Sequence, residues 1–215
     1  MYEFARGPLV WIAFLVFIAG SLYRVVSLLL LARKDKVFYA YLNPKYGLRS
    51  ILHWVVPYGS VNMRMRPVFT FLSFLFHVCL LVTPAFLIGH IVLWNQSWGV
   101  HWWSLPGGLA NAMTAIVVFT GILFALRRLV DPVVRYVTSA ADFLILAVVL
   151  APFVTGLLAY YQAFDYRTLI TLHMFTGALW LMAIPLTRLI HMLLFPLTRA
   201  YMGSESGFVR NSRDW

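Results

Sequence analysis

Five apolar segments, each long enough to cross the hydrocarbon core of a lipid bilayer, constrain this chain of 215 residues more than any other feature. A core of about 30 Å requires about 20 consecutive apolar residues in an α-helix. The segments that meet this requirement lie at 8–32, 67–94, 108–130, 138–161 and 168–197. Since 62% of the residues are hydrophobic and only 11% are charged, the composition is more apolar than that of a soluble domain. In addition, no stretch of the sequence resembles a polar linker between two cores. The sequence therefore predicts an all-α integral membrane bundle of five transmembrane helices, formed as a single domain over residues 1–215.

The distribution of lysine and arginine predicts the orientation of these helices. The loop 33–66, the turn after the third segment and the tail 198–215, with the end of the fifth segment, contain Arg33, Lys34, Lys36, Lys45, Arg49, Arg64, Arg66, Arg127, Arg128, Arg135, Arg188, Arg199, Arg210 and Arg213. On the other side there are only Arg6 and Arg167. Because basic residues favour the cytoplasmic side, we expect the N-terminus outside and the C-terminus in the cytoplasm. The net charge of +10 follows from this bias. Since it is spread over juxtamembrane loops, it does not indicate a nucleic-acid partner.

Four of the six histidines lie inside the second and fifth segments, namely His77, His90, His173 and His191. Ionisable residues within a membrane span are costly and usually mark a functional site. The alternative for any single histidine is a hydrogen bond to a neighbouring helix. Two pairs on two helices favour a functional role for all four.

The directions of the two helices predict how these histidines pair. The second helix runs outward and the fifth runs inward, so neighbouring helices would bring His77 to His191 near the cytoplasm and His90 to His173 near the outer face. On a continuous fifth helix, the eighteen residues from His173 to His191 make about five turns. Both imidazoles would then lie on one face, roughly 27 Å apart.

Two facing imidazoles at each level predict the kind of cofactor. Axial coordination by two neutral imidazoles is a common way to hold an electron-transferring haem. Zinc or copper would need further ligands at each level, and the spans offer little beyond Asp142 and the single cysteine, Cys79. No CxxCH motif or cysteine cluster is present for a c-type haem or an iron–sulfur cluster. The sequence therefore predicts two b-type haems.

The spacing of the histidines on the second helix needs a local distortion. His77 and His90 are thirteen residues apart, about 220° around an ideal helix, so they should not share a face. Pro84 lies between them and is expected to kink the helix and to re-phase His90. Gly89 would allow a porphyrin to approach the backbone closely, although ordinary small-residue helix packing is the alternative.

Two long runs of the sequence resemble the respiratory nitrate reductase gamma subunit family. They are "RRLVDPVVRYVTSAADFLILAVVLAPFVTGLL" and "TLHMFTGALWLMAIPLTRLIHM", and "FLFHVCLL" and "IGH" match the ligand positions of the family on its second helix. The resemblance covers about residues 67–200. It implies a five-helix cytochrome b with two haems, in which His77 and His191 ligate the inner haem and His90 and His173 the outer one.

Two departures make the chain more similar to the cytochrome b subunits of transmembrane redox complexes of sulfate-reducing bacteria. The ligands on the second helix are more widely spaced than in nitrate reductase gamma subunits, and the first loop is longer, with "LHWVVPYGSVNMRMRPVF". This resemblance implies a bacterial or archaeal cytoplasmic membrane and a cytoplasmic iron–sulfur subunit, heterodisulfide-reductase-like or nitrate-reductase-beta-like. The lysine that nitrate reductase gamma subunits place beside the outer quinol pocket has no counterpart in "SLPGGLANAMT".

Further residues are candidates for contacts with the haems and with a quinone. The candidates for pairing with the propionates of the inner haem are Arg128, Arg188 and Arg135. The same arginines would also serve as plain membrane anchors. The candidates for an outer quinone site are Gly89, Trp94 and His101. His101 would be the proton acceptor of that site, and its alternative is an ordinary interfacial residue.

The sequence therefore predicts a di-haem b membrane subunit of a respiratory oxidoreductase complex. It would carry electrons between a quinone pool, menaquinone in particular, or a periplasmic multihaem cytochrome c, and a cytoplasmic iron–sulfur subunit. No nucleophile or substrate pocket is visible, so the chain would not be catalytic alone. The alternatives are a haem-free membrane anchor and a small transporter, although a transporter usually shows paired repeats with broken helices.

Overall fold

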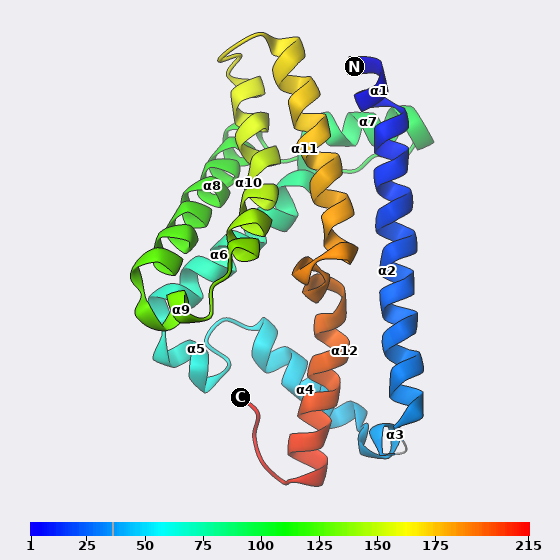
Figure 1. Ribbon diagram of the computed structural model, residues 1–215, viewed down its shortest axis with the longest axis vertical. Helices are drawn as coiled ribbons and strands as arrows, with labels where there is room; N and C mark the ends of the chain where they lie inside the picture. The colour runs from blue at the N-terminus through cyan, green and yellow to red at the C-terminus, as the bar shows by residue number, and fades with distance from the viewer. Residues whose placement is uncertain (36) are drawn as a thin grey trace. The chain divides into compact units, whose positions relative to one another are not determined.

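The computed structural model describes residues 1–35 and 37–215, and Lys36, counted above among the basic loop residues, lies outside the described residues. Within those ranges every regular element is helical, so the all-α prediction is confirmed (Figure 1). In chain order the elements are α1 (Tyr2–Arg6), α2 (Pro8–Lys34), α3 (Phe38–Tyr41), α4 (Pro44–Val55), α5 (Val61–Met65), α6 (Pro67–Phe86), α7 (Ile88–Trp98), α8 (Gly107–Val130), α9 (Pro132–Tyr136), α10 (Ala140–Tyr160), α11 (Tyr166–Leu186), the 3₁₀ turn η1 (Arg188–Ile190), α12 (His191–Ser204) and the π-helical turn η2 (Glu205–Val209).

Five helical stretches in the described part of the chain are long and apolar enough to cross a membrane. They are Tyr2–Lys34, Pro67–Phe86, Gly107–Val130, Ala140–Tyr160 and Tyr166–Leu186. The prediction of a multi-pass bundle with five transmembrane helices is therefore confirmed. The third and fourth stretches agree closely with the predicted segments because their ends carry strong local signals. Asp131 accepts hydrogen bonds from the first turn of α9, and Ser139 with Asp142 forms a capping box at the start of α10.

The fifth predicted segment, 168–197, is wrong as one continuous helix. α11 ends at Leu186, and Thr187 has an extended backbone (φ −126°, ψ −170°). Pro185 lacks the N–H that would continue the helical ladder, and the Thr187 hydroxyl accepts a hydrogen bond from the Leu189 N–H at 3.2 Å, which starts a new turn. His191 is the first residue of α12, so it and His173 are on different helices.

The chain divides into two compact units. The first contains Met1–Val10 and Leu72–Trp180, and the second contains Trp11–Phe71 and Leu181–Trp215. In the first unit α8 lies beside α10 (Figure 1). Lipid tails are as apolar as the helices, so close backbone approach rather than water exclusion holds such helices together. Gly121 of α8 provides that approach, because a Cβ atom there would lie 2.5 Å from the Leu150 side chain of α10.

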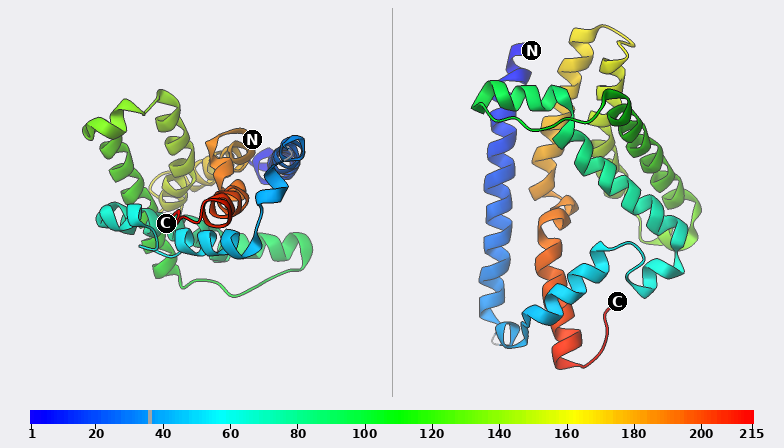
Figure 2. Two further views of the ribbon diagram at one scale, coloured as in Figure 1. Left: turned by 90° about the horizontal axis from the view of Figure 1, so that it is seen from below. Right: turned by 180° about the vertical axis from the view of Figure 1, so that it is seen from behind.

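In the second unit α4 packs against α12 through small residues (Figure 2). A Cβ atom on Gly203 of α12 would lie 2.2 Å from the Cβ atom of Ser50, so only glycine fits there. A Cβ atom on Gly47 of α4 would likewise lie 3.1 Å from the Ala200 carbonyl. The two backbones are therefore held in direct contact, and neighbouring polar side chains can reach across the helix pair.

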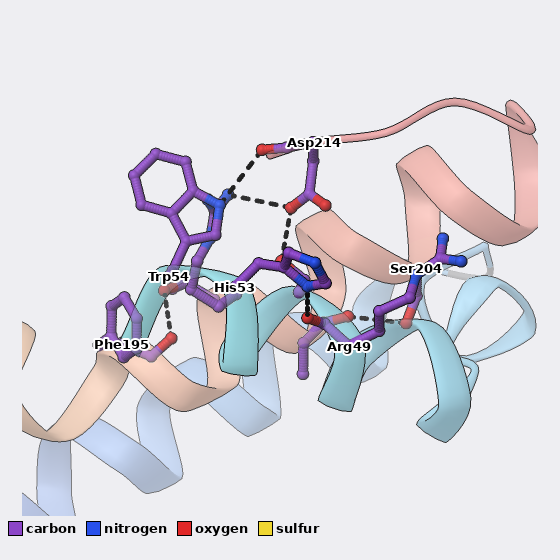
Figure 3. A network of polar contacts seen from close by, with 10 residues as sticks. Arg49, His53, Trp54, Phe195, Ser204 and Asp214 are labelled. Atoms are coloured by element: carbon purple, nitrogen blue, oxygen red, sulfur yellow. Dashed lines mark hydrogen bonds and ion pairs between the residues drawn. The ribbon is translucent and has the colours of Figure 1, made fainter. Parts of the chain in front are cut away.

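The tail of the chain folds back onto this helix pair (Figure 3). The Ser50 hydroxyl donates to the Asp214 carboxylate, and the Trp54 indole N–H donates to the Asp214 carbonyl at 3.2 Å. Arg199 of α12 lies 3.8 Å from the same carboxylate, and its guanidinium is 4.4 Å from the centre of the Trp54 ring. The Asp214 side chain is only 7% exposed. Much of the predicted polar tail 198–215 is thus folded against α4.

Candidate functional site

A break in the second transmembrane helix determines where His90 lies. Leu87, between α6 and α7, has an extended backbone (φ −72°, ψ 128°), and its carbonyl accepts the N–H of His90 at 3.0 Å. Pro84 was predicted to re-phase His90, but it lies inside α6, and the break comes three residues later. Pro84 contributes in another way, because its carbonyl oxygen accepts a hydrogen bond from His90 Nδ1 at 2.8 Å. The predicted single helix 67–94 is therefore two helices.

His173 lies on the part of α11 that belongs to the first unit, and it is held against α10 of the same unit. Its Nδ1 atom lies 2.9 Å from the carbonyl oxygen of Pro152 on α10, and the hydroxyl of Thr155 is 3.5 Å away. Gly156, four residues after Pro152, leaves the space for the imidazole. A Cβ atom at Gly156 would lie 3.2 Å from His173 Cε1 and Nδ1.

The structure brings His90 and His173 together. Their ring centroids are 6.0 Å apart and the ring planes differ by 14°. A backbone carbonyl can only accept, so the Nδ1 atom of each ring must carry the proton that is donated to Pro84 or Pro152. In each neutral imidazole the Nε2 lone pair is then left for a metal ion. The two imidazoles are held in the tautomer that a ligand pair requires.

The geometry of this pair fits one metal ion between two axial imidazoles. With both Nε2 atoms turned toward one metal ion, a metal–nitrogen bond of about 2.0 Å would place the two nitrogens roughly 4 Å apart and the ring centres roughly 6 Å apart. The observed separation of the ring centroids is 6.0 Å. No group of three or more His, Cys, Asp or Glu gathers anywhere in 1–35 or 37–215. Cβ atoms added at Gly89, next to His90, and at Gly177, one turn after His173, would meet nothing within 4 Å. The residues present therefore fit a bis-histidine haem.

His77 and His191 are anchored in the same manner, but the structure does not bring them together within one unit. His77, on the part of α6 in the first unit, has Nδ1 2.7 Å from the Ser73 carbonyl. His191, in the second unit, has Nδ1 2.9 Å from the Arg188 carbonyl. Both side chains are exposed within the chain.

The predicted propionate partners lie in three different elements. Arg128 of α8 is half-buried and donates to the Thr138 hydroxyl at 3.3 Å. Arg135 of α9 and Arg188 of η1 are exposed. The structure therefore places the three candidate guanidinium groups on three elements, and that of Arg128 already donates to one acceptor, the Thr138 hydroxyl.

The predicted quinone-site residues lie on α7 and in the loop that follows it. Gly89 is the second residue of α7. Trp94 packs edge-to-face on Trp98, with ring centroids 4.3 Å apart, and its ring centroid is 5.9 Å from that of Trp102. His101 is exposed in the loop between α7 and α8. The tryptophans form an aromatic cluster on α7 and the loop after it, and α7 is also the helix that carries His90.

Sequence reasoning missed Gly156, Thr155 and the carbonyl of Pro152, which together orient His173. The "APFVTG" stretch carried the only signal, since a proline and a glycine four residues apart inside an apolar helix indicate close packing. Nothing in the stretch identifies a histidine on another helix as the group that is packed there.

The helix that carries His173 is capped by a titratable residue outside the membrane. Asp165 Oδ2 accepts hydrogen bonds from the Thr168 hydroxyl at 2.7 Å and the Thr168 N–H at 2.8 Å. These hydrogen bonds, with a smaller effect of the nearby Arg167 charge, hold the pKa of the Asp165 carboxyl below its usual value. A carboxylate with a lowered pKa stabilises the folded state above its unfolded pKa of about 4, and that stabilisation is lost as the pH falls through the lower folded pKa.

We therefore expect Asp165→Asn to lower the thermal unfolding midpoint of the detergent-purified protein at neutral pH. Asparagine keeps the size and an accepting oxygen but not the charge. The difference from the unsubstituted protein should shrink as the pH is lowered through the acid range. A loss of the same size at neutral and at strongly acidic pH would contradict the role assigned to the charge.

Five membrane-spanning helices and a pair of anchored imidazoles define a multi-pass helical membrane protein with a candidate bis-histidine site. No family model matches the chain. The chain is 38% identical to a protein of Nitratidesulfovibrio vulgaris strain Hildenborough over 215 residues, which covers 98% of this chain and 95% of the relative. The chain belongs to the family of that protein. The relative is named only "Protein", which specifies no activity, cofactor or partner.

Proposed function

We propose that this chain is the di-haem b membrane subunit of a respiratory oxidoreductase complex and carries electrons across a bacterial or archaeal cytoplasmic membrane. The observation that supports this proposal best is the separation of 6.0 Å between the His90 and His173 rings, each with its Nδ1 atom bonded to a carbonyl. The resemblance to the nitrate reductase gamma subunit family supports the same function. The haem, when bound, supplies the one-electron couple, and the chain holds and orients it.

The residues around the outer pair, His90 and His173, hold and orient the haem without introducing charge. Nε2 of His90 and of His173 bind the iron, and the carbonyls of Pro84 and Pro152 hold the protons on Nδ1. Neutral donors and acceptors satisfy each other, so no uncompensated charge is placed in the apolar interior. Gly156 leaves the room that the His173 ring needs in this position, because a larger residue there would push against the ring.

The second haem in this proposal is bound by His77 and His191 near the cytoplasm. Each has its Nδ1 bonded to a backbone carbonyl, as in the outer pair. Arg128, Arg135 and Arg188 are the candidates for pairing with its propionates. A guanidinium can form two parallel hydrogen bonds to a carboxylate, which makes arginine suited to this role.

The electron partner on the cytoplasmic side is proposed to be an iron–sulfur subunit, heterodisulfide-reductase-like or nitrate-reductase-beta-like. The loop 33–66 and the tail 198–215 are basic, and charge of one sign speeds the encounter with an acidic partner. Purification after gentle solubilisation, with native lipid retained, should recover that subunit together with the chain. A chain that always isolates alone under these conditions would count against this partner.

At the outer end, electrons are exchanged either with menaquinone or with a periplasmic multihaem cytochrome c. The exposed aromatic side chains Trp98 (47%) and Trp103 (65%) offer a contact surface for either partner. His101 is the candidate proton acceptor for a quinol. Rapid haem reduction by a menaquinol analogue that His101→Ala slows supports the quinone, and reduction by reduced cytochrome c alone supports the cytochrome.

A dithionite-reduced minus oxidised absorption spectrum, together with haem quantitation, tests the function itself. The expected result is a b-type spectrum with two haems per chain. A purified, folded protein without haem would overturn the proposal and favour a haem-free membrane anchor subunit.

A further inference from the structure

The break at Leu87 leaves carbonyl groups at the end of α6 without helical partners. The last carbonyls of any helix have no N–H four residues further along, and other groups must satisfy them. Here three consecutive carbonyls find three different donors. Pro84 O accepts from His90 Nδ1 at 2.8 Å, Ala85 O accepts from Trp102 Nε1 at 2.9 Å, and Phe86 O accepts from the Leu105 N–H at 2.9 Å. The haem ligand candidate is thus one of three groups that cap the same helix end.

The other two donors come from the segment between α7 and α8, which folds back over the break. Gly99 ends α7 in the left-handed conformation (φ 67°), which allows the chain to reverse. The Trp103 ring then stacks on Phe86 with the ring centroids 4.3 Å apart. This segment therefore fixes the backbone of the last turn of α6 by two hydrogen bonds and one ring contact.

We infer that Trp102 is a positioning residue for His90, on the basis of the proposed haem function. The peptide groups of Pro84 and Ala85 are neighbours, so the indole N–H that holds the Ala85 carbonyl also restricts the direction of the Pro84 carbonyl. That carbonyl in turn orients His90 and, by accepting its Nδ1 proton, makes Nε2 a more basic ligand. Without Trp102, the Ala85 carbonyl loses its donor, and the last turn of α6 is free to relax.

Tryptophan is usually enriched at membrane interfaces because its ring is amphipathic. That role differs from the positioning role inferred for Trp102. The two roles can be separated by one substitution. Trp102→Phe keeps an aromatic ring at the interface and removes the N–H together with the five-membered ring of the indole. Trp103→Phe is the matched control, since it makes the same change in the next residue and keeps the ring that stacks on Phe86.

Redox titration of the purified, haem-loaded protein, with haem quantitation, is the test. A less basic His90 binds ferric iron less strongly, so Trp102→Phe should raise the midpoint potential of the haem that His90→Ala removes. The reduction equilibrium constant should change by on the order of tenfold, the lower end of the effect that removing an outer partner of a metal ligand has on affinity or activity. The potential of the other haem should stay unchanged, and Trp103→Phe should shift neither.

Each outcome of the titration either supports or overturns the role of Trp102. A shift, or a loss of haem, confined to the haem of His90 supports it. No shift with both haems present, an equal effect on both haems, or the same effect from Trp103→Phe overturns it while leaving the proposed function intact. A native protein that binds no haem overturns the proposed function, and the inference with it.

Discussion

His173→Ala and His90→Ala are each expected to reduce the haem content from two to one per chain and to remove the same haem. The two rings are 6.0 Å apart, so one iron atom would take a ligand from each. A methyl group cannot replace an imidazole ligand, and in residues 1–35 and 37–215 no third His, Cys, Asp or Glu joins this pair. Haem quantitation and the reduced minus oxidised spectrum of each purified variant measure this directly.

His53→Ala is the matched control for this experiment. His53 also has its Nδ1 atom bonded to a backbone carbonyl, that of Arg49 at 2.8 Å (Figure 3). Its ring, however, stacks on Trp215, with the ring centroids 4.3 Å apart, rather than on another histidine. Its removal should leave two haems. If His173→Ala and His90→Ala removed different haems, the assignment of this pair as the two ligands of one iron would be wrong.

His77→Ala and His191→Ala are expected to remove the other haem and to leave the spectrum of the first intact. The prediction depends on the opposite directions that the sequence predicts for the second and fifth membrane segments, which would put these two histidines near the same face. Each has its Nδ1 atom bonded to a carbonyl of its own helical segment, as in the His90–His173 pair. The spectra of His77→Ala and His191→Ala should be the same, and each should show the haem that His90→Ala and His173→Ala remove. A one-haem species shared by His77→Ala and His173→Ala would rule out this arrangement.

The transmembrane helices could be predicted from the sequence because membrane insertion depends on length and apolar composition. Where a local signal ends the helix, as Asp131 does after α8, the predicted end was correct. The breaks at Leu87 and Thr187 were not predicted. Pro84 and Pro185 weaken the helices nearby, but the position of each break depends on which other groups satisfy the freed backbone. At Leu87 one such group is the distant Trp102 indole, and at Thr187 it is the hydroxyl of that residue itself, which many threonines could offer.

The candidate site was predictable to a similar degree. Histidine inside a predicted membrane segment is rare enough to identify the ligand candidates by residue type. The structure keeps His77 and His173 inside membrane-spanning stretches and places His90 on α7 and His191 on α12, beyond the ends of those stretches. The groups that orient them, such as the Pro152 carbonyl, were not predictable because every residue has a carbonyl and only the folded structure selects one. The roles of Gly156 and Trp102 were not predictable either, since glycine and tryptophan have common alternative roles in membrane helices.

All four candidate ligands are bonded through Nδ1 to backbone carbonyls, not to aspartate or glutamate side chains. This has a consequence for how such a protein can evolve. A carbonyl is present whatever the side chain, so Ser73 or Arg188 can be exchanged without loss of the acceptor for the ligand. Selection would act instead on the path of the main chain, through the residues that set the helix breaks. Divergent members of this family should therefore be recognised by the positions of their helix breaks relative to the histidines, and a search for acidic partners of the ligands would miss them.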